Sequence, residues 1–259
     1  MTAETAIVER WSAEWQPPSA VVVRGTVVLL PGRGEPASAY VRLGERLAAD
    51  GYRVLAVGSD VDPDGLRRAI RADPGPRPVV LIGADTGAAT ALALSRTAVT
   101  DGIAAVVLAG LPVPGGTGDA RTATASGRTW DEELDARTAC PVHRRRLSED
   151  RDVVRGALWS VPVGPLSTGA PSVPVLALHG ELDVISPPAA VGAVLGRASG
   201  VRLVVVAGGR HDVLNDVHHR SVAAEIVQFL ERLRLSPDAR PILRDEPPGS
   251  ARDQSTVER

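Results

Sequence analysis

The fold is decided by residues 79–94, which read VVLIGADTGAATALAL. The first residues form a short apolar run, as expected for a strand buried on both faces of a sheet. From Thr86 onward, alanine and leucine follow one another with helical spacing. Gly83 and Gly87 flank Asp85 between the two patterns, and glycine permits the tight turn that such a junction requires. The stretch therefore predicts a strand, a sharp turn and a helix, with an aspartate at the turn.

The same alternation of short apolar runs and helical segments continues along most of the chain. Strands are expected at Gly25–Leu30, Arg53–Val57, Pro78–Gly83, Ile103–Ala109, Val173–Leu178 and Val201–Val206, with earlier antiparallel strands at Ala20–Val23 and Thr5–Trp11. Helices are expected at Ser38–Asp50, Thr86–Val99, Pro187–Arg197 and His219–Leu233. Because buried strands alternate with helices, we predict an α/β fold with a mostly parallel central sheet and helices on both faces.

Composition limits the classes of function. The chain has 259 residues, of which 44% are hydrophobic, and a formal net charge of −2. It has no basic field to hold nucleic acid or an anionic membrane. All 29 cationic residues are arginine, which excludes a Schiff-base lysine and the lysine of a nucleotide-binding P-loop. Because Cys140 is the single cysteine, an intramolecular disulfide and a thiolate zinc site are excluded.

The ends of the chain and one central region differ from the rest. Residues 1–10 lack the apolar stretch of a secretory signal, and no apolar run approaches the ~18 residues of a membrane span, so we expect a cytoplasmic protein without a membrane span. Residues 113–172 contain no convincing strand and predict a helical lid inserted into a core formed by residues 1–112 and 173–235. Residues 236–259 predict a disordered tail.

Polar loops follow four of the expected strands, at the sheet edge where open parallel sheets bind their ligands. The loops read PGRGE at 31–35, GADTG at 83–87, HGELD at 179–183 and GGRHD at 208–212. Each contains at least one glycine where a tight turn or close backbone approach needs one. The loops bring acidic residues and two histidines to one edge, which favours acid–base or nucleophilic chemistry there.

With its loops in this order, the sequence resembles the α/β-hydrolase fold, nearest the monoglyceride-lipase and lysophospholipase-like branch. The matching stretches are VVLLPGRGE, AYVRLGERLAADGYRVLA, VVLIGADTGAATALAL, VPVLALHGELDVISPP and GGRHDVLNDVHHRSVAAEIVQFLERL. The resemblance implies a hydrolase of a small-molecule substrate that needs no cofactor or metal. It assigns a triad of Asp85, Asp183 and His211 in the family's chain order. It also implies an oxyanion hole made by the backbone N–H groups of Arg33 and Thr86.

The nucleophile position departs from the resemblance, because Asp85 stands where the family's G-x-S-x-G elbow has serine. Another branch of the fold, similar to haloalkane dehalogenases and epoxide hydrolases, has aspartate there. Its carboxylate attacks a saturated carbon, and a histidine-activated water hydrolyses the resulting ester. That branch usually continues with tryptophan, where this chain has Thr86. The only tyrosines, Tyr40 and Tyr52, lie outside the expected lid, which disfavours a tyrosine-dependent epoxide hydrolase.

Several alternatives remain open from the residues themselves. Asp85 could act as an acid or base without covalent attack, in a lyase or an esterase. It could also be only the N-cap of its helix, in a binding protein or a catalytically degenerate enzyme. Asp212 and Glu181 compete with Asp183 as the acid that orients the histidine. The side chain of Arg33 is expected to be an exposed cation, with binding of an anionic group of the substrate as the alternative.

The remaining candidates are weaker. Trp130 and Trp159 flank the charged part of the expected lid, as pocket walls or packing anchors. His179 resembles a structural histidine of the family. Cys140 and His143 have poor spacing for a metal, and we predict no metal site. Nothing in the sequence specifies the substrate or the oligomeric state.

Overall fold

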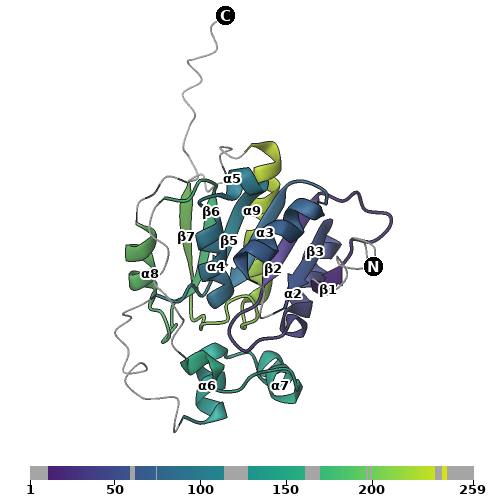
Figure 1. Ribbon diagram of the computed structural model, residues 1–259. Coiled ribbons are helices and arrows are strands. Elements are labelled where there is room, and N and C mark those ends of the chain that lie inside the picture. Colours follow the sequence, from purple (N-terminus) through teal and green to yellow (C-terminus); the bar gives the residue numbers. More distant parts are fainter. Residues whose placement is uncertain are drawn as a thin grey trace, which may run out of the picture.

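A computed structural model describes residues 11–58, 62–73, 75–113, 128–160, 170–196, 198, 200–236 and 241–243. Within these residues a seven-stranded sheet has the order β1-β3-β2-β4-β5-β6-β7 (Figure 1). The strands are β1 Trp11–Trp15, β2 Gly25–Leu30, β3 Tyr52–Val57, β4 Val79–Ala84, β5 Ile103–Ala109, β6 Val175–Gly180 and β7 Val201–Val206. Only the edge strand β1 pairs antiparallel within this sheet. The predicted mostly parallel sheet is therefore confirmed.

Helices cover both faces of the sheet, as predicted. The helices of the described residues are η1 Ala37–Tyr40, α2 Val41–Ala49, α3 Pro63–Ala72, α4 Thr86–Leu94, α5 Ala98–Asp101, α6 Trp130–Arg137, α7 Pro141–Glu149, η3 Ala157–Trp159, α8 Pro188–Leu195 and α9 His219–Leu235. On one face, α2 and α9 pack against alternate strand residues such as Val27. On the other, α3, α4, α5 and α8 pack against the intervening residues such as Val28. Each fully buried large aliphatic side chain contributes about 1.5–3 kcal/mol to such cores.

The strand predictions hold except near the N-terminus. β2, β5 and β7 have the expected bounds, and β3, β4 and β6 differ from them by at most two residues. The expected strand at Ala20–Val23 is wrong: the Val21 N–H donates to the Pro18 carbonyl at 2.8 Å in a turn, and Val22 is 84% exposed. β1 begins at Trp11, where the expected strand Thr5–Trp11 ends, and residues 1–10 lie outside the described ranges.

Helix α3 was not predicted, although its start has a clear local signal. The Asp62 side chain accepts a hydrogen bond from the Gly65 N–H at 2.8 Å, and Pro63 is the first helical residue. An N-cap aspartate followed by proline at this position is a strong helix start.

The single helix expected over Thr86–Val99 is divided into α4 and α5. The hydroxyl of Ser95 donates to the Leu92 carbonyl at 2.6 Å, and the Thr97 N–H donates to Leu94 at 3.2 Å in a turn. A serine that bonds to nearby backbone in this way competes with continued helix.

The chain between β5 and β6 forms α6, α7 and η3 in its described residues 128–160, which we call the β5–β6 connection. It lies below the sheet in Figure 1, beside the loops that follow the strands. Residues 114–127 and 161–169, and nearly all of the expected tail at 236–259, lie outside the described ranges. No helix in the described ranges combines the length and the apolar composition needed to cross a membrane.

Candidate active site

Asp85 occupies a strained turn between β4 and α4. Its φ is 46° and its ψ is −116°, and no other non-glycine residue in the described ranges has a positive φ. A Cβ on Gly83 would lie 2.2 Å from the carbonyl oxygen of Gly87, and a Cβ on Gly87 would lie 2.3 Å from that of Leu30. The turn therefore needs both glycines. Strain of about 1–3 kcal/mol at such a residue is typical of functional sites.

The Asp85 side chain does not cap the helix that it precedes. Its carboxylate makes no capping hydrogen bond to α4, although Asp85 holds the N-cap position. The side chain is 3% exposed and faces Arg33 and His211 instead. The alternative that Asp85 only caps its helix is therefore not supported, because its carboxylate is directed to Arg33 and His211.

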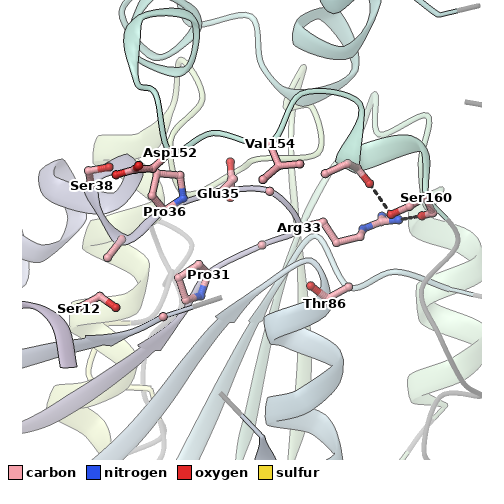
Figure 2. A pocket seen from close by; sticks show the side chains of 15 residues that line it. Ser12, Pro31, Arg33, Glu35, Pro36, Ser38, Thr86, Asp152, Val154 and Ser160 are labelled. Atoms are coloured by element: carbon pink, nitrogen blue, oxygen red, sulfur yellow. Dashed lines mark hydrogen bonds between the residues drawn. The ribbon is translucent and has the colours of Figure 1, made fainter. Parts of the chain in front are cut away.

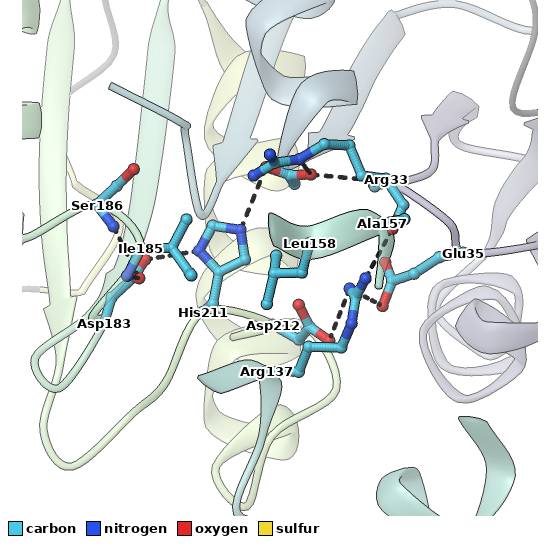
Figure 3. Close-up of polar contacts among 12 residues, drawn as sticks. Arg33, Glu35, Arg137, Ala157, Leu158, Asp183, Ile185, Ser186, His211 and Asp212 are labelled. Atoms are coloured by element: carbon cyan, nitrogen blue, oxygen red, sulfur yellow. Dashed lines mark hydrogen bonds and ion pairs between the residues drawn. The ribbon is translucent and has the colours of Figure 1, made fainter. Parts of the chain in front are cut away.

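His211 lies between two carboxylates (Figure 3). Its Nδ1 is hydrogen-bonded to Asp183 Oδ2 at 2.8 Å, and its Nε2 is 3.3 Å from Asp85 Oδ1. The second contact is an ion pair without hydrogen-bond geometry, and Nε2 has no hydrogen-bond partner among the described residues. The structure thus brings together the three residues that the sequence analysis assigned to a triad.

Asp183 is the carboxylate that is hydrogen-bonded to His211 Nδ1, and the loop after β6 fixes its position. Its Oδ1 accepts hydrogen bonds from the N–H groups of Ile185 at 2.8 Å and Ser186 at 3.0 Å. His179 Nε2 lies 2.9 Å from Oδ2, so this histidine helps to hold the acid. The competing candidate Glu181 is exposed and accepts from the N–H of Gly208.

Burial and charge act in opposite directions on the ionisation of the triad. Burial lowers the pKa of His211, but the Asp183 and Asp85 carboxylates raise it to about 10. Burial raises the pKa of Asp85, yet His211 and Arg33 hold that pKa well below its usual range. Burial also raises the pKa of Asp183, and His211 and His179 hold it below its usual range. At neutral pH the site contains an imidazolium between two carboxylates.

Arg33 is a partner of Asp85, and the expectation of an exposed cation is wrong. Its side chain is 10% exposed, with Nε donating to Asp85 Oδ2 at 2.6 Å and Nη2 to Oδ1 at 2.9 Å. Nη1 donates to the Ser160 carbonyl. The buried carboxylate requires a charged partner, and Arg33 supplies it. The Arg33 N–H also donates to Asp85 Oδ2 at 3.0 Å, so the carboxylate itself occupies this expected oxyanion donor.

A pocket of about 610 Å³ opens beside this ion pair (Figure 2). The loop at 31–38 forms one wall, Asp152, Val154 and Ser160 of the β5–β6 connection form another, and Thr86 lines it at the start of α4. The expected pocket walls Trp130 and Trp159 do not line it. The Trp130 indole N–H donates to Ser148 Oγ at 3.0 Å. The Trp159 ring packs against the Arg128 guanidinium, whose central carbon lies 4.2 Å from the ring centroid.

A second buried cluster, which the sequence analysis did not assemble, consists of Glu35, Arg137, His143 and Asp212. Glu35, His143 and Asp212 offer ligand atoms that lie within 4.8 Å of one another. Arg137 Nη1, however, lies 3.4 Å from Glu35 Oε1 and 3.7 Å from Asp212 Oδ2, where it already provides positive charge. A metal ion would be repelled by this guanidinium, so we treat the group as an ion-pair cluster. The Asp212 carboxylate belongs to this cluster, since its Oδ2 lies 3.7 Å from Arg137 Nη1 and 3.5 Å from His143 Nε2.

The charges of this cluster influence one another strongly. Burial raises the pKa of Asp212, and the neighbouring Glu35 carboxylate raises it further, against the opposing effect of Arg137 and His143. Burial lowers the pKa of His143, but the carboxylates of Asp212 and Glu35 reverse that effect and raise it. The Tyr40 hydroxyl donates to Glu35 and accepts from the Gly32 N–H at 3.0 Å. No local motif connects these residues in the sequence, and only the tertiary structure brings them together.

Comparison with known proteins gives the fold. No protein-family model and no curated protein matches the sequence. A soluble variant of monoglyceride lipase from Saccharomyces cerevisiae is 16% identical, with a TM-score of 0.65 over 84% of this chain and 90% of that one. A monoacylglycerol lipase of Paleococcus ferrophilus is 20% identical (TM-score 0.61, 84% and 96%), and an esterase of Rhodococcus sp. is 22% identical (TM-score 0.62, 84% and 93%). The chain thus has the α/β-hydrolase fold.

Proposed function

We propose that this chain is a cofactor-free hydrolase of a small organic substrate. Asp85 acts as the nucleophile, His211 as the base and Asp183 as the acid that orients the histidine. The observation that carries this proposal is the position of His211, with Nδ1 2.8 Å from Asp183 and Nε2 3.3 Å from Asp85. The strained turn at Asp85 and its missing helix-capping bond support it. We place the chain nearest the monoglyceride-lipase-like branch, whose motifs its sequence resembles.

The aspartate restricts the bond that can be cleaved. In the first step an Asp85 oxygen attacks a saturated carbon, and the bond from that carbon to halogen or oxygen breaks with its electron pair leaving on the halide or oxygen. An oxygen leaving group takes the proton of the His211 imidazolium. Attack on an ester carbonyl would instead form a mixed anhydride, so the substrate class is a halide or an ether-like compound reactive at saturated carbon.

The second step regenerates the carboxylate. His211, held by Asp183, takes a proton from water as the water oxygen attacks the carbonyl carbon of the Asp85 ester. The N–H groups of Arg33 and Thr86 stabilise the oxyanion that forms, and its collapse releases an alcohol. Esterification removes the negative charge of Asp85 beside the imidazole. The pKa of His211 therefore falls in the intermediate, where a base is needed.

A second candidate is a binding protein with the same fold. The observation that favours it is the Arg33–Asp85 ion pair, because a carboxylate that accepts three hydrogen bonds is a weak nucleophile. In that case the pocket beside Arg33 holds a ligand without converting it, and Asp85 serves as the counterion of the arginine.

Trapping the covalent intermediate separates the two candidates. His211→Gln is treated with haloalkanes, epoxides, lactones and esters, and intact mass with peptide mapping then locates any adduct. We expect an adduct on the Asp85 peptide from a halide or an ether-like substrate, and none in the double variant with Asp85→Asn. Asp64→Asn, an exposed aspartate on α3, is the matched control and keeps wild-type turnover. Turnover that is undiminished in Asp85→Asn contradicts the proposal.

Isotope labelling distinguishes covalent attack from Asp85 acting as an acid or base. One turnover in ¹⁸O-water places the label in the Asp85 carboxylate if the ester forms, because water attacks that carbonyl carbon. The alcohol released then carries ¹⁶O. Direct attack of water on the substrate places ¹⁸O in the product at once, and this outcome rules out the covalent route.

A further inference from the structure

Arg137 is the largest fully buried side chain in the described part of the molecule, at 1% exposure. It lies at the end of α6, outside the triad and outside the lining of the pocket. Burying a guanidinium costs free energy unless it is paired and hydrogen-bonded. The partners of the buried Arg137 guanidinium therefore show which segments of the chain it joins.

Its side chain holds the loop that follows β2. Nη2 donates to the carbonyl oxygen of Arg33 at 2.8 Å, and Nη1 lies 3.4 Å from Glu35 Oε1 (Figure 3). Both partners belong to the loop whose Arg33 N–H donates to the Asp85 carboxylate. Arg137 thus contacts the loop directly after the expected oxyanion donor, through one backbone carbonyl and one carboxylate.

The same turn of α6 holds the loop that follows β7. The Ala136 carbonyl accepts from the His211 N–H at 3.3 Å, and the Arg137 carbonyl accepts from the Asp212 N–H at 2.8 Å. Nη1 of Arg137 is also 3.7 Å from Asp212 Oδ2. The residue beside the catalytic histidine is therefore tied to α6 through backbone and side chain.

A third contact fixes Arg137 within the β5–β6 connection. Nε and Nη2 donate to Glu133 Oε1 at 3.2 and 2.9 Å, one helical turn away. Glu133 also accepts from the backbone N–H groups of Gly156 and Leu158, and it is 1% exposed. The guanidinium is held in one orientation, which a positioning group requires.

We propose that Arg137 is a positioning residue, which sets the oxyanion loop and the histidine loop at a fixed distance from each other. Through Arg137, the β5–β6 connection then helps to position the loops that carry Arg33 and His211. The catalytic consequence rests on the proposed function. The positioning itself depends only on the contacts of Arg137 and is measurable without a substrate.

The test uses Arg137→Gln and Arg137→Lys in the full chain, with Arg144→Gln as the matched control. Arg144 lies on α7 and pairs with the exposed Asp135. Nitrogen and proton NMR reports the hydrogen-bonded Nδ1–H of His211, and amide exchange reports its backbone N–H. We expect Arg137→Gln to broaden or lose the Nδ1–H signal and to speed exchange at residues 211 and 212 about ten-fold. Arg144→Gln should match the wild type.

Arg137→Lys keeps the charge and loses the planar fork, so it decides the question if Arg137→Gln does not fold. A folded lysine variant with the wild-type Nδ1–H signal and wild-type exchange overturns the proposal. Once a substrate is in hand, we expect Arg137→Lys to lower kcat about ten-fold with KM within two-fold. If the wild type hydrolyses nothing, the proposed function fails, while the NMR and exchange results still decide the role of Arg137.

Discussion

Two buried arginines in this protein face carboxylates in different ways. Arg33 binds the single carboxylate of Asp85 through three donors at 2.6–3.0 Å, and it also lines the pocket. Arg137 is shared among three acidic side chains on three separate segments, and its side chain is 1% exposed against 10% for Arg33. A ligand in the pocket can therefore compete for Arg33, whereas displacing Arg137 disturbs three segments at once. The two pairs have the same chemistry, and their positions in the fold decide which of them a ligand in the pocket can contact.

The largest effect is expected at Asp85, the carboxylate whose arginine partner lines the pocket. Asp85→Asn removes the proposed nucleophile, while asparagine still tolerates the positive φ of the turn. We expect turnover to fall by about 10³-fold or more, with the fold unchanged by circular dichroism. Turnover of the substrate found by the trapping screen is the measurement, and residual activity within ten-fold of the wild type contradicts the assignment.

The next effect is on the free energy of unfolding and concerns Arg137 with its three acidic partners. Arg137→Gln leaves buried carboxylates without their cation, so we expect the free energy of unfolding to fall by about 3–5 kcal/mol. Urea unfolding followed by tryptophan fluorescence measures this. Arg144→Gln serves as the control and should cost less than about 0.5 kcal/mol, because its ion pair is exposed. Equal losses of stability in the two variants would contradict the structural role of Arg137.

A smaller effect is expected on the pH profile when Arg33 is replaced. The guanidinium helps to hold the pKa of Asp85 below its usual range, and activity requires the ionised carboxylate. Arg33→Gln therefore raises that pKa and moves the acid limb of kcat/KM to higher pH. Arg24→Gln, on a distant arginine paired with Glu231, should leave the profile unchanged. Superimposable profiles of Arg33→Gln and wild type contradict this role.

The smallest effect concerns a half-exposed pair far from the site. The Arg24 guanidinium and the Tyr52 hydroxyl lower the pKa of Glu231 to about 2 against the effect of burial. A lowered folded-state pKa stabilises the protein above the ordinary value near 4.5, and the contribution is lost as pH falls toward 2. Glu231→Gln should cost about 0.5–1 kcal/mol at pH 7 and almost nothing near pH 2, measured by urea unfolding. A difference that persists at low pH contradicts the electrostatic origin.

Much of the fold could be predicted because its signals are local. The apolar run of β4 followed by the turn at Asp85 and by α4 is readable from residues 79–94 alone. α3 was missed although Asp62 and Pro63 marked its start, because its helical face has few apolar residues. The edge strand was misplaced since an exposed run such as Ala20–Val23 has the composition of a strand without a partner to pair with.

The triad and the partners of the two arginines differ in how far the sequence could predict them. The loops that carry Asp85, Asp183 and His211 could be placed together from the sequence, because parallel strands bring their carboxyl ends to one edge. The resemblance to the α/β-hydrolase fold then assigned the three residues. The partners of those residues depend on tertiary structure. Arg33 meets Asp85 across 52 positions of the chain, and Arg137 reaches the Arg33 carbonyl across 104. Neither separation leaves a periodic or compositional trace.

The sequence by itself determined the α/β architecture, the order of the polar loops and the identity of the residue at the sharp turn. Hydrophobic period, glycine placement and strand polarity act over a few residues, which is why they can be read directly. Only the tertiary structure decided that the Asp85 carboxylate pairs with Arg33 instead of capping α4, and that Arg137 is buried among acidic side chains. Such pairings depend on burial, because a desolvated charge takes whichever opposite charge the packed chain brings within reach.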